Sequence, residues 1–432
     1  MALLNGKFPF LSRIFAGISP ENSAEETEAA HEELTAPRQF PPQDIALLLL
    51  FLLIGYFIRK AMFVGMAWSD DYDYTQIAVM ILDGRYNPVD IGRYNLYGWR
   101  FAMVFPLAFF FKIFNSTAEN VAALWPLLAS LGTSAALYVI GTKLFDSRTG
   151  LIAAILHLLY PADILFSTCV LTETPFNFLI ALSVLFFVLG EESPRWWVKL
   201  PCFFMAGSMA TWLLYGRPYG IMVIGAYGLF MMMRYVINLR YLVILLGFGA
   251  TLFGIEYLVH QMTGLWFENF NVMKRLLDPN FVSNSNLAEH LNFYGNVLFN
   301  DRMHYPHFYI MIIGFGALFG WSRLGKLGDP GLTPETEKRS RQNGFLVLFW
   351  MMSILLYIEF GFMNLDHMSL MHKLDRYLTI ISAPICLGAA PFLSRFSNRY
   401  AIALTGLIFT ALAVWWYFAV LPPDLRHLIG FP

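Results

Sequence analysis

The sequence predicts an all-α, polytopic membrane protein, and three observations support this fold class. The 432-residue chain is 57% hydrophobic and only 14% charged, whereas soluble domains carry about 25% charged residues. Its mean hydropathy is +0.54. Its apolar residues gather in runs of roughly 17–25 residues, which is the length of a bilayer-spanning helix. We therefore expect one integral membrane body rather than the two or three soluble domains that this length would otherwise suggest.

Residues 1–43 do not follow this apolar pattern. The segment MALLNGKFPFLSRIFAGI lacks the apolar core and the small-residue cleavage site of a signal peptide. An acidic stretch bounded by prolines follows it and has no periodic apolar face. We expect a cytoplasmic tail, largely disordered, over 1–43 and a membrane domain over 44–432.

Eleven apolar runs predict about eleven transmembrane helices in the rest of the chain. No internal repeat relates these runs to one another. The runs lie near residues 44–64, 121–142, 150–166, 175–190, 198–215, 218–234, 241–260, 305–321, 344–361, 377–393 and 400–420.

The segment 98–114, GWRFAMVFPLAFFFKIF, decides the predicted topology. It is apolar but short and contains Pro106, and short apolar stretches lie at the membrane interface more often than they span it. If it does not span and the N-terminus is cytoplasmic, nearly every short cytoplasmic loop is basic, as the positive-inside rule expects. If it spanned, Lys143 and Arg148 would move outside and the pattern would break. We therefore expect an amphipathic segment on the outer surface.

This topology places the segments 65–120, 261–304 and 362–376 on the outer side. Many cations lie there, which indicates that something anionic is handled on that side. The formal net charge of −1 and the lack of a polybasic run give no sign of a nucleic-acid partner. The three cysteines are scattered and predict neither a disulfide framework nor a metal cluster.

The stretch WSDDYDYTQIA, residues 68–78, directly follows the first predicted span. Ser69 or Asp70 can cap a helix over 71–83, and Gly84 is expected to end it. Caps and solvated positions account for one or two acidic residues. A third beside a membrane span favours a functional carboxylate. The expected apolar face of the helix consists of Tyr74, Ile77, Ala78, Ile81 and Leu82.

Three further positions on the outer side are candidates. Glu173 stands at a predicted helix start, where it either complements the helix macrodipole or binds an acceptor or a metal. Arg217, in the helix-breaking stretch YGRPYG, is either an interfacial residue of a tight turn or a ligand of the substrate. In 365–384, His372 and Arg376 share a helix face. This pair favours phosphate binding over interfacial anchoring, and a metal site with His367 is the weakest alternative.

Taken in order, these motifs resemble the GT-C superfamily of integral-membrane glycosyltransferases, in particular its protein O-mannosyltransferase and aminoarabinose-transferase-like branch. That branch has an acidic pair after the first span, then a tyrosine, a small helix ending in glycine, and an aromatic amphipathic segment. The corresponding residues here are Asp70, Asp71, Tyr74, Gly84 and 98–114.

The resemblance continues along the chain with weaker matching in the middle. LFDSRTG at 144–150 is similar to a short basic cytoplasmic turn of the branch, and Glu173 matches an acid at the outer end of the third span. RYLTIISAP resembles the start of a late helix in the branch, and His372 is similar to the histidine of the HKxxRF motif of dolichol-dependent mannosyltransferases.

The resemblance implies a transferase that moves a sugar from a polyprenyl-phosphate donor to a hydroxyl acceptor, with inversion, on the outer face of the membrane. Asp70 is then the better candidate for the base, with Asp71 supporting it or binding acceptor. The second acid of the pair is often Glu in this branch, and Asp73 is an addition here, so which carboxylate acts stays open. The donor phosphate would be held by Arg376, His372, Arg59 and Arg217, and the substrates also by Asp73, Tyr74 and Glu173.

The acceptor implied is a lipid, a glycan or a protein, and the setting is a bacterial inner membrane with the site facing the periplasm or the cell exterior. No cofactor is required, although a divalent cation bridging carboxylate and phosphate stays open. The alternative class is a transporter or flippase for an anionic lipid or sugar, which would also use ionisable groups at membrane boundaries.

Overall fold

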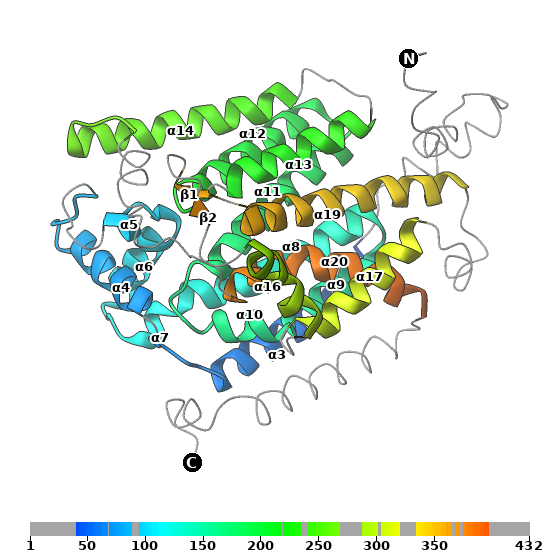
Figure 1. Cartoon of the computed structure of the whole chain (residues 1–432), viewed down its shortest axis with the longest axis horizontal. Coiled ribbons are helices and arrows are strands. Elements are labelled where there is room, and N and C mark those ends of the chain that lie inside the picture. Colours follow the sequence, from blue (N-terminus) through cyan, green and yellow to red (C-terminus); the bar gives the residue numbers. More distant parts are fainter. Residues whose placement is uncertain are drawn as a thin grey trace. The chain divides into compact units, whose positions relative to one another are not determined.

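The computed structural model confirms a nearly all-helical chain (Figure 1). The only strands in the described ranges are the short antiparallel pair β1 (Phe362–Asn364) and β2 (Ser369–Leu370). The tail over 1–39, His372 and the predicted span near 400–420 lie outside the described residues. The structure describes residues 40–67, 69–88, 95–217, 219–234, 241–267, 287–300, 304–319, 334–360, 362–364, 369–370 and 375–396.

Each of the other ten predicted spans coincides with a helix or a pair of consecutive helices. Six described helices are long and apolar enough to cross a membrane, which makes this a multi-pass membrane protein. The predicted number of eleven is not confirmed. The helices are α3 (Pro42–Ala61), α8 (Leu124–Leu144), α9 (Ser147–Leu158), α10 (Pro161–Phe166), α11 (Glu173–Glu192), α12 (Trp196–Leu214), α13 (Tyr219–Arg234), α14 (Leu242–Thr263), α17 (Tyr305–Phe319), α19 (Pro334–Phe360), η4 (Asp375–Ile381) and α20 (Ser382–Phe396), with α16 (Leu287–Asn300) packed on α17.

The predicted span 150–166 is interrupted in the structure. It forms α9 and α10, which are separated at Tyr160. Pro161 is the first residue of α10, and it cannot supply the backbone N–H that would continue α9. The break makes α10 a separate short helix, and α10 carries Asp163, one partner of the ion pair described below.

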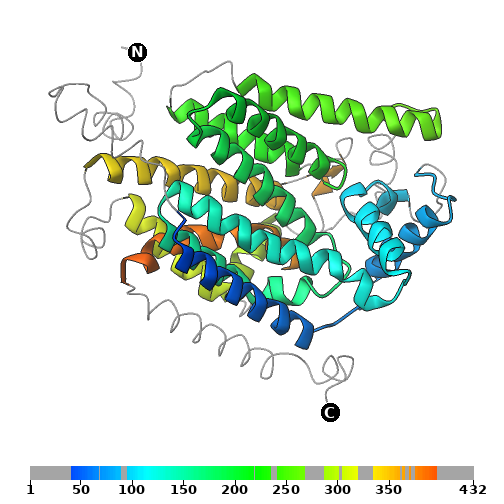
Figure 2. The same ribbon diagram turned by 180° about the vertical axis from the view of Figure 1, so that it is seen from behind.

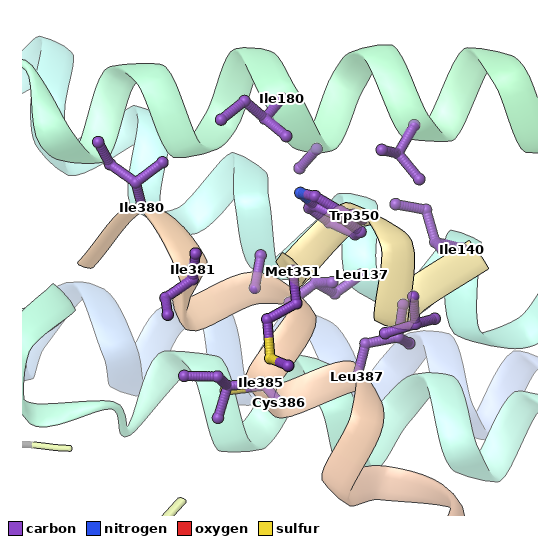
Figure 3. Packing of buried hydrophobic residues seen from close by; sticks show 14 of the residues in the cluster. Leu137, Ile140, Ile180, Trp350, Met351, Ile380, Ile381, Ile385, Cys386 and Leu387 are labelled. Carbon is purple, nitrogen blue, oxygen red and sulfur yellow. The ribbon is translucent and has the colours of Figure 1, made fainter. Parts of the chain in front are cut away.

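The main core lies where α8, α9, α11, α17, α19 and α20 meet. Trp350 of α19 is 1% exposed, and it shares this core with side chains of α8, α11, η4 and α20 (Figure 3). Between spanning helices in lipid, close packing replaces the hydrophobic drive that water provides. The labelled side chains of Figure 3 are Leu137, Ile140, Ile180, Trp350, Met351, Ile380, Ile381, Ile385, Cys386 and Leu387.

A second, smaller core is built from the helices between α3 and α8. Figures 1 and 2 show α4 (Ser69–Leu82), α5 (Asn95–Gly98), α6 (Phe101–Phe114) and α7 (Glu119–Ala122) side by side. The predicted apolar face of α4 is confirmed for Tyr74, Ile77 and Ala78, which are fully buried against α6, whereas Leu82 is exposed. At about 1.5 Å per residue, the 14 residues of α6 are too short to span, in agreement with the prediction for 98–114.

The start of α4 differs from the cap prediction, and its end agrees with the prediction. The helix begins at Ser69, so Ser69 and Asp70 lie in its first turn. Asp71 supplies the bond at this end, because its Oδ2 accepts from the backbone N–H of Ala67 at 2.9 Å. Gly84 ends the helix as predicted, with a φ of +68° that a residue without a Cβ adopts at no steric cost.

The crossing of α8 and α9 depends on Gly150, and this generates a test. A Cβ added at Gly150 would overlap the backbone of Tyr138 and Thr142. We predict that Gly150→Ala lowers stability by about 1–3 kcal/mol, the usual cost of overpacking, measured as thermal unfolding by tryptophan fluorescence in detergent. The control is Gly249→Ala on α14, where a Cβ meets nothing within 4 Å. Equal effects of the two substitutions would contradict the packing described.

Candidate active site

Asp70 and Arg376, which are 306 residues apart in the sequence, meet in the structure. Arg376 Nη2 donates to Asp70 Oδ2 at 2.8 Å. The Asp70 side chain is 17% exposed and that of Arg376 is 13% exposed. The pair is therefore mostly enclosed but still accessible, so a substrate can contact it. The first loop and the start of η4 form one site, as the sequence reasoning required.

Glu173 joins this pair from the first turn of α11. Its Oε1 lies 3.4 Å from Arg376 Nε, and its side chain is 2% exposed. Arg376 therefore lies between two carboxylates, one accessible and one buried. The position of Glu173 at a helix N-terminus also suits a negative charge, so both readings of this residue are compatible with the geometry.

Two tyrosine hydroxyls bind charged groups of the site, one at Asp70 and one at Arg100. Tyr97 donates its O–H to Asp70 Oδ1 at 3.0 Å. Tyr74, which the sequence suggested as a substrate ligand, is fully buried, and its hydroxyl oxygen accepts from Arg100 Nη1. Tyr74 therefore supports Arg100 from beneath and does not reach substrate, which corrects the expectation for this residue.

Arg100 is the site residue that the sequence reasoning did not single out. It directly precedes α6 and lies over the rings of Tyr74 and Tyr97, with 5.5 and 5.1 Å from Cζ to the ring centroids. Its side chain is buried and its Nε has no hydrogen-bond partner among the described residues. The available signal was a cation at the start of an aromatic amphipathic segment, a pattern that interfacial anchors share.

Arg217 approaches from the turn between α12 and α13. Its Cζ lies 4.0 Å from the centroid of the Tyr377 ring, and its Nη1 lies 3.4 Å from the Tyr219 hydroxyl oxygen. No carboxylate of the described residues forms an ion pair with Arg217 or Arg100. Both guanidinium groups are thus held by aromatic rings and hydroxyls, which leaves their charge available to an anion.

The charges of this site act on one another. Burial alone would raise the pKa of Asp70, but the charge and hydrogen bond of Arg376, followed by the charge of Arg100 and the Tyr97 hydroxyl, hold it below its usual value. Burial and then repulsion by Arg217 lower the pKa of Arg100 to about 10. Asp70 is therefore ionised at neutral pH, and Arg100 keeps its positive charge there.

Asp71 and Asp73 differ in position from Asp70. Asp71 is fully buried, and its Oδ2 accepts from the backbone of Ala67, so it shapes the chain that leads into α4. The expected role of Asp71, supporting Asp70 or binding acceptor, stays a prediction. Asp73 is half-buried, and its charge contributes to the raised pKa of Tyr97 after burial and the effects of Asp70.

Arg59 is not part of the site, which corrects its assignment as a phosphate ligand. Its side chain is 0% exposed, and Nη2 is 2.8 Å from Oδ2 of the equally buried Asp163 on α10. Its Nε donates to the hydroxyls of Ser130 and Ser167 at 2.9 and 3.0 Å. Nη1 donates to two carbonyls, those of Gly55 and Leu158. All of its donor groups are therefore used within the helix bundle.

Metal-ligating side chains do not gather into a site within the described residues. No group of three His, Cys, Asp or Glu side chains in those ranges is arranged to hold a metal ion. His372 and His367 lie outside them, so the possible divalent cation stays an expectation.

Comparison with solved structures identifies this architecture. ArnT from Cupriavidus metallidurans in the apo state matches with a TM-score of 0.59 at 14% identity, over 88% of this chain and 66% of that chain. The same protein bound to undecaprenyl phosphate gives a TM-score of 0.58 at 14% identity, over 89% and 67%. The oligosaccharyltransferase of Archaeoglobus fulgidus, in complex with Zn and sulfate, matches with a TM-score of 0.51 at 14% identity, over 88% and 52%.

The fold is that of the GT-C membrane glycosyltransferases. This confirms the resemblance seen in the sequence. The chain spans about two thirds of the length of ArnT and about half of the oligosaccharyltransferase. A sequence family described as dolichyl-phosphate-mannose-protein mannosyltransferase matches residues 101–268. No curated protein sequence matches the chain.

The interpretation of Arg59 as a structural residue generates a double-substitution test. Removing one partner of a buried ion pair leaves an uncompensated charge, so Arg59→Met or Asp163→Leu alone should lower stability by about 3–5 kcal/mol. The double variant should recover most of this loss, because neither charge then remains. Thermal unfolding in detergent measures all three variants. If the double variant is as unstable as the singles, the pairing described for Arg59 is wrong.

Proposed function

We propose that this protein is a glycosyltransferase that moves a sugar from a polyprenyl-phosphate donor to a hydroxyl acceptor. The observation that carries the proposal is the contact between Asp70 and Arg376. It sets an accessible carboxylate beside a cluster of guanidinium groups in a fold shared with ArnT. A carboxylate can take a proton from an acceptor, and guanidinium groups can hold a departing phosphate.

Asp70 is the proposed general base. Of the three acids at the start of α4, it alone pairs with Arg376 while remaining accessible. In the proposed step the acceptor oxygen attacks the anomeric carbon as its proton passes to Asp70. The bond from that carbon to the phosphate oxygen breaks on the opposite side, and its electron pair stays on the phosphate. The configuration at the anomeric carbon is thereby inverted.

Arg100, Arg217 and Arg376 are the proposed clamp for the phosphate. Charge develops on the leaving phosphate during transfer, and prepositioned donors in an enclosed site stabilise that charge. No carboxylate in the described ranges forms an ion pair with Arg100 or Arg217, so no such pair there competes with the donor phosphate for these two guanidinium groups. A phosphate leaves readily without an acid, so one base and a cationic clamp suffice.

The donor is proposed to be membrane-borne, and the setting is proposed to be a bacterial inner membrane with the site toward the periplasm. The distribution of cations in the short loops supports this orientation. Among the structural relatives, ArnT was solved bound to undecaprenyl phosphate. AglB from Archaeoglobus fulgidus was solved in complex with an inhibitory peptide and a dolichol-phosphate, and it matches with a TM-score of 0.50 at 12% identity, over 88% of this chain and 55% of that chain. The proposed acceptor is a lipid, a glycan or a protein.

Substitution of Asp70 tests the base assignment. Asp70→Asn should reduce transfer by about 10²–10⁴-fold, the usual contribution of a general base, while binding of the lipid-linked donor is retained. The measurement is transfer of labelled sugar in membranes with donor binding assayed in parallel. Asp83→Asn, an exposed acid of the same segment, is the control. Unchanged transfer in Asp70→Asn would refute the role, and lost donor binding would point to a different one.

The pH dependence gives a second test of the same group. Asp70 acts only when ionised, and its lowered pKa places the acid limb of kcat/KM below the usual aspartate pKa of about 3.9. In Arg376→Gln the raising effect of burial is no longer opposed by the Arg376 charge, so the limb should move to higher pH. An acid limb at the same pH in the wild type and in Arg376→Gln would contradict the electrostatic coupling between Asp70 and Arg376.

Removal of the cations tests the phosphate clamp. Arg100→Gln and Arg217→Gln should weaken donor binding by about 1.5–3 kcal/mol each, the range for hydrogen bonds to charged groups. Titration of detergent-solubilised protein with labelled polyprenyl phosphate measures this loss. Arg85→Gln is the matched control, because Arg85 belongs to the same outer segment but is 67% exposed and paired with Asp83. Equal binding by all three variants would contradict the clamp.

A further inference from the structure

A line of buried polar side chains leads from the candidate active site into the helix bundle. On α11 it consists of Glu173, Thr174 and Asn177, and on the facing η4 and α20 it consists of Thr379 and Ser382. All five are at most 1% exposed, and α11 packs against both η4 and α20. We call these five residues the polar seam.

Contacts at both ends of the polar seam hold its two sides together. At one end, Arg376 Nε lies 3.4 Å from Glu173 Oε1. At the other end, Asn177 Nδ2 donates to Ser382 Oγ at 2.9 Å. Thr379 lies on η4, between Arg376 and Ser382 in the sequence, and it is fully buried.

Several buried polar atoms of the polar seam have no hydrogen-bond partner among the described residues. Glu173 Oε2, Asn177 Oδ1 and the hydroxyls of Thr174 and Thr379 have no hydrogen-bond partner within the part of the chain that the structure describes. Beyond Asn177, His157 Nε2 lies 3.3 Å from Asn177 Nδ2 and 3.7 Å from Asp163 Oδ1, and this last oxygen is also without a partner in the same ranges.

The chemistry of these atoms indicates what kind of molecule can form hydrogen bonds with them. A carboxylate oxygen and an amide oxygen only accept hydrogen bonds, so Glu173 Oε2, Asn177 Oδ1 and Asp163 Oδ1 cannot satisfy one another. Each of these three oxygens needs a hydrogen-bond donor. Each threonine hydroxyl can donate only one proton. Water donates two hydrogen bonds and accepts two, and buried water typically makes about three bonds to such otherwise unpaired groups.

We propose that the polar seam is a binding site for a chain of ordered water molecules that runs from Glu173 toward His157. These waters donate hydrogen bonds to the second oxygen of Glu173, whose other oxygen faces Arg376. Hydration of the seam is independent of the proposed transfer reaction and is tested without an activity assay.

The sign of a stability change tests the proposal first. Thr379→Val and Thr174→Val replace a hydroxyl by a methyl group of nearly equal size. If water bonds these hydroxyls, both substitutions should lower the Tm, because a hydrogen bond is lost. The matched control is Thr211→Val. The Thr211 hydroxyl donates to the Phe248 carbonyl at 2.8 Å, and the loss of this hydrogen bond should also lower the Tm. A Tm that is raised or unchanged in both seam variants means that the hydroxyls are dry, and it overturns the proposal.

Radiolytic footprinting in ¹⁸O-labelled water tests the wild-type protein directly. Ionising pulses generate hydroxyl radicals from water, so a buried side chain beside bound water is labelled despite its burial. His157 is the reporter, and Tyr227 is the control because it is equally buried, stacked on Phe187 and bonded to Ser183. After correction for intrinsic reactivity, His157 should be labelled several-fold faster than Tyr227. Labelling of His157 at or below the rate of Tyr227 overturns the proposal.

Discussion

The Arg376 guanidinium is the interaction on which the rest of the site depends. It contacts Asp70 from α4 and Glu173 from α11, so three segments that are far apart in the sequence converge on one side chain. Without the cation between them, the two carboxylates would repel each other because they carry the same charge. The geometry of the site therefore depends on how the helix bundle positions these three side chains.

Buried polar contacts between helices position Asp70, Glu173 and Arg376. The chain after α3 is fastened to the loop before α11, because the N–H of Gly65 donates to the Thr168 carbonyl at 3.2 Å. One turn earlier, the Arg59–Asp163 pair joins α3 to α10. Such a pair is weak evidence for net stability, but breaking it would leave an uncompensated charge buried in the helix bundle, so it holds α3 against α10. The start of α4, and with it Asp70, is set by this arrangement.

Much of this could be predicted from the sequence, because apolar periodicity is a local signal. The spans, the buried face of α4 and the stop at Gly84 all come from residues that are near one another in the chain. The expected meeting of Asp70 and Arg376 rested on order and topology, and the structure places them 2.8 Å apart.

The errors concern side chains whose partners are distant in sequence. Arg59 looked available because its partner, Asp163, follows 104 residues later and no local pattern links them. Tyr74 was expected to contact substrate, but it is buried against α6 and its hydroxyl accepts from Arg100, which lies 26 residues later in the chain. Arg100 was overlooked because a cation before an apolar helix also suits a plain interfacial anchor.

The most direct test of the central claim is an experimental structure of the full chain in lipid nanodiscs with a polyprenyl phosphate added. We predict that the phosphate group lies within hydrogen-bonding distance of Arg376 and of Arg100 or Arg217, with Asp70 beside it. A phosphate bound elsewhere in the bundle, or Asp70 and Arg376 on opposite sides of the membrane, would contradict it.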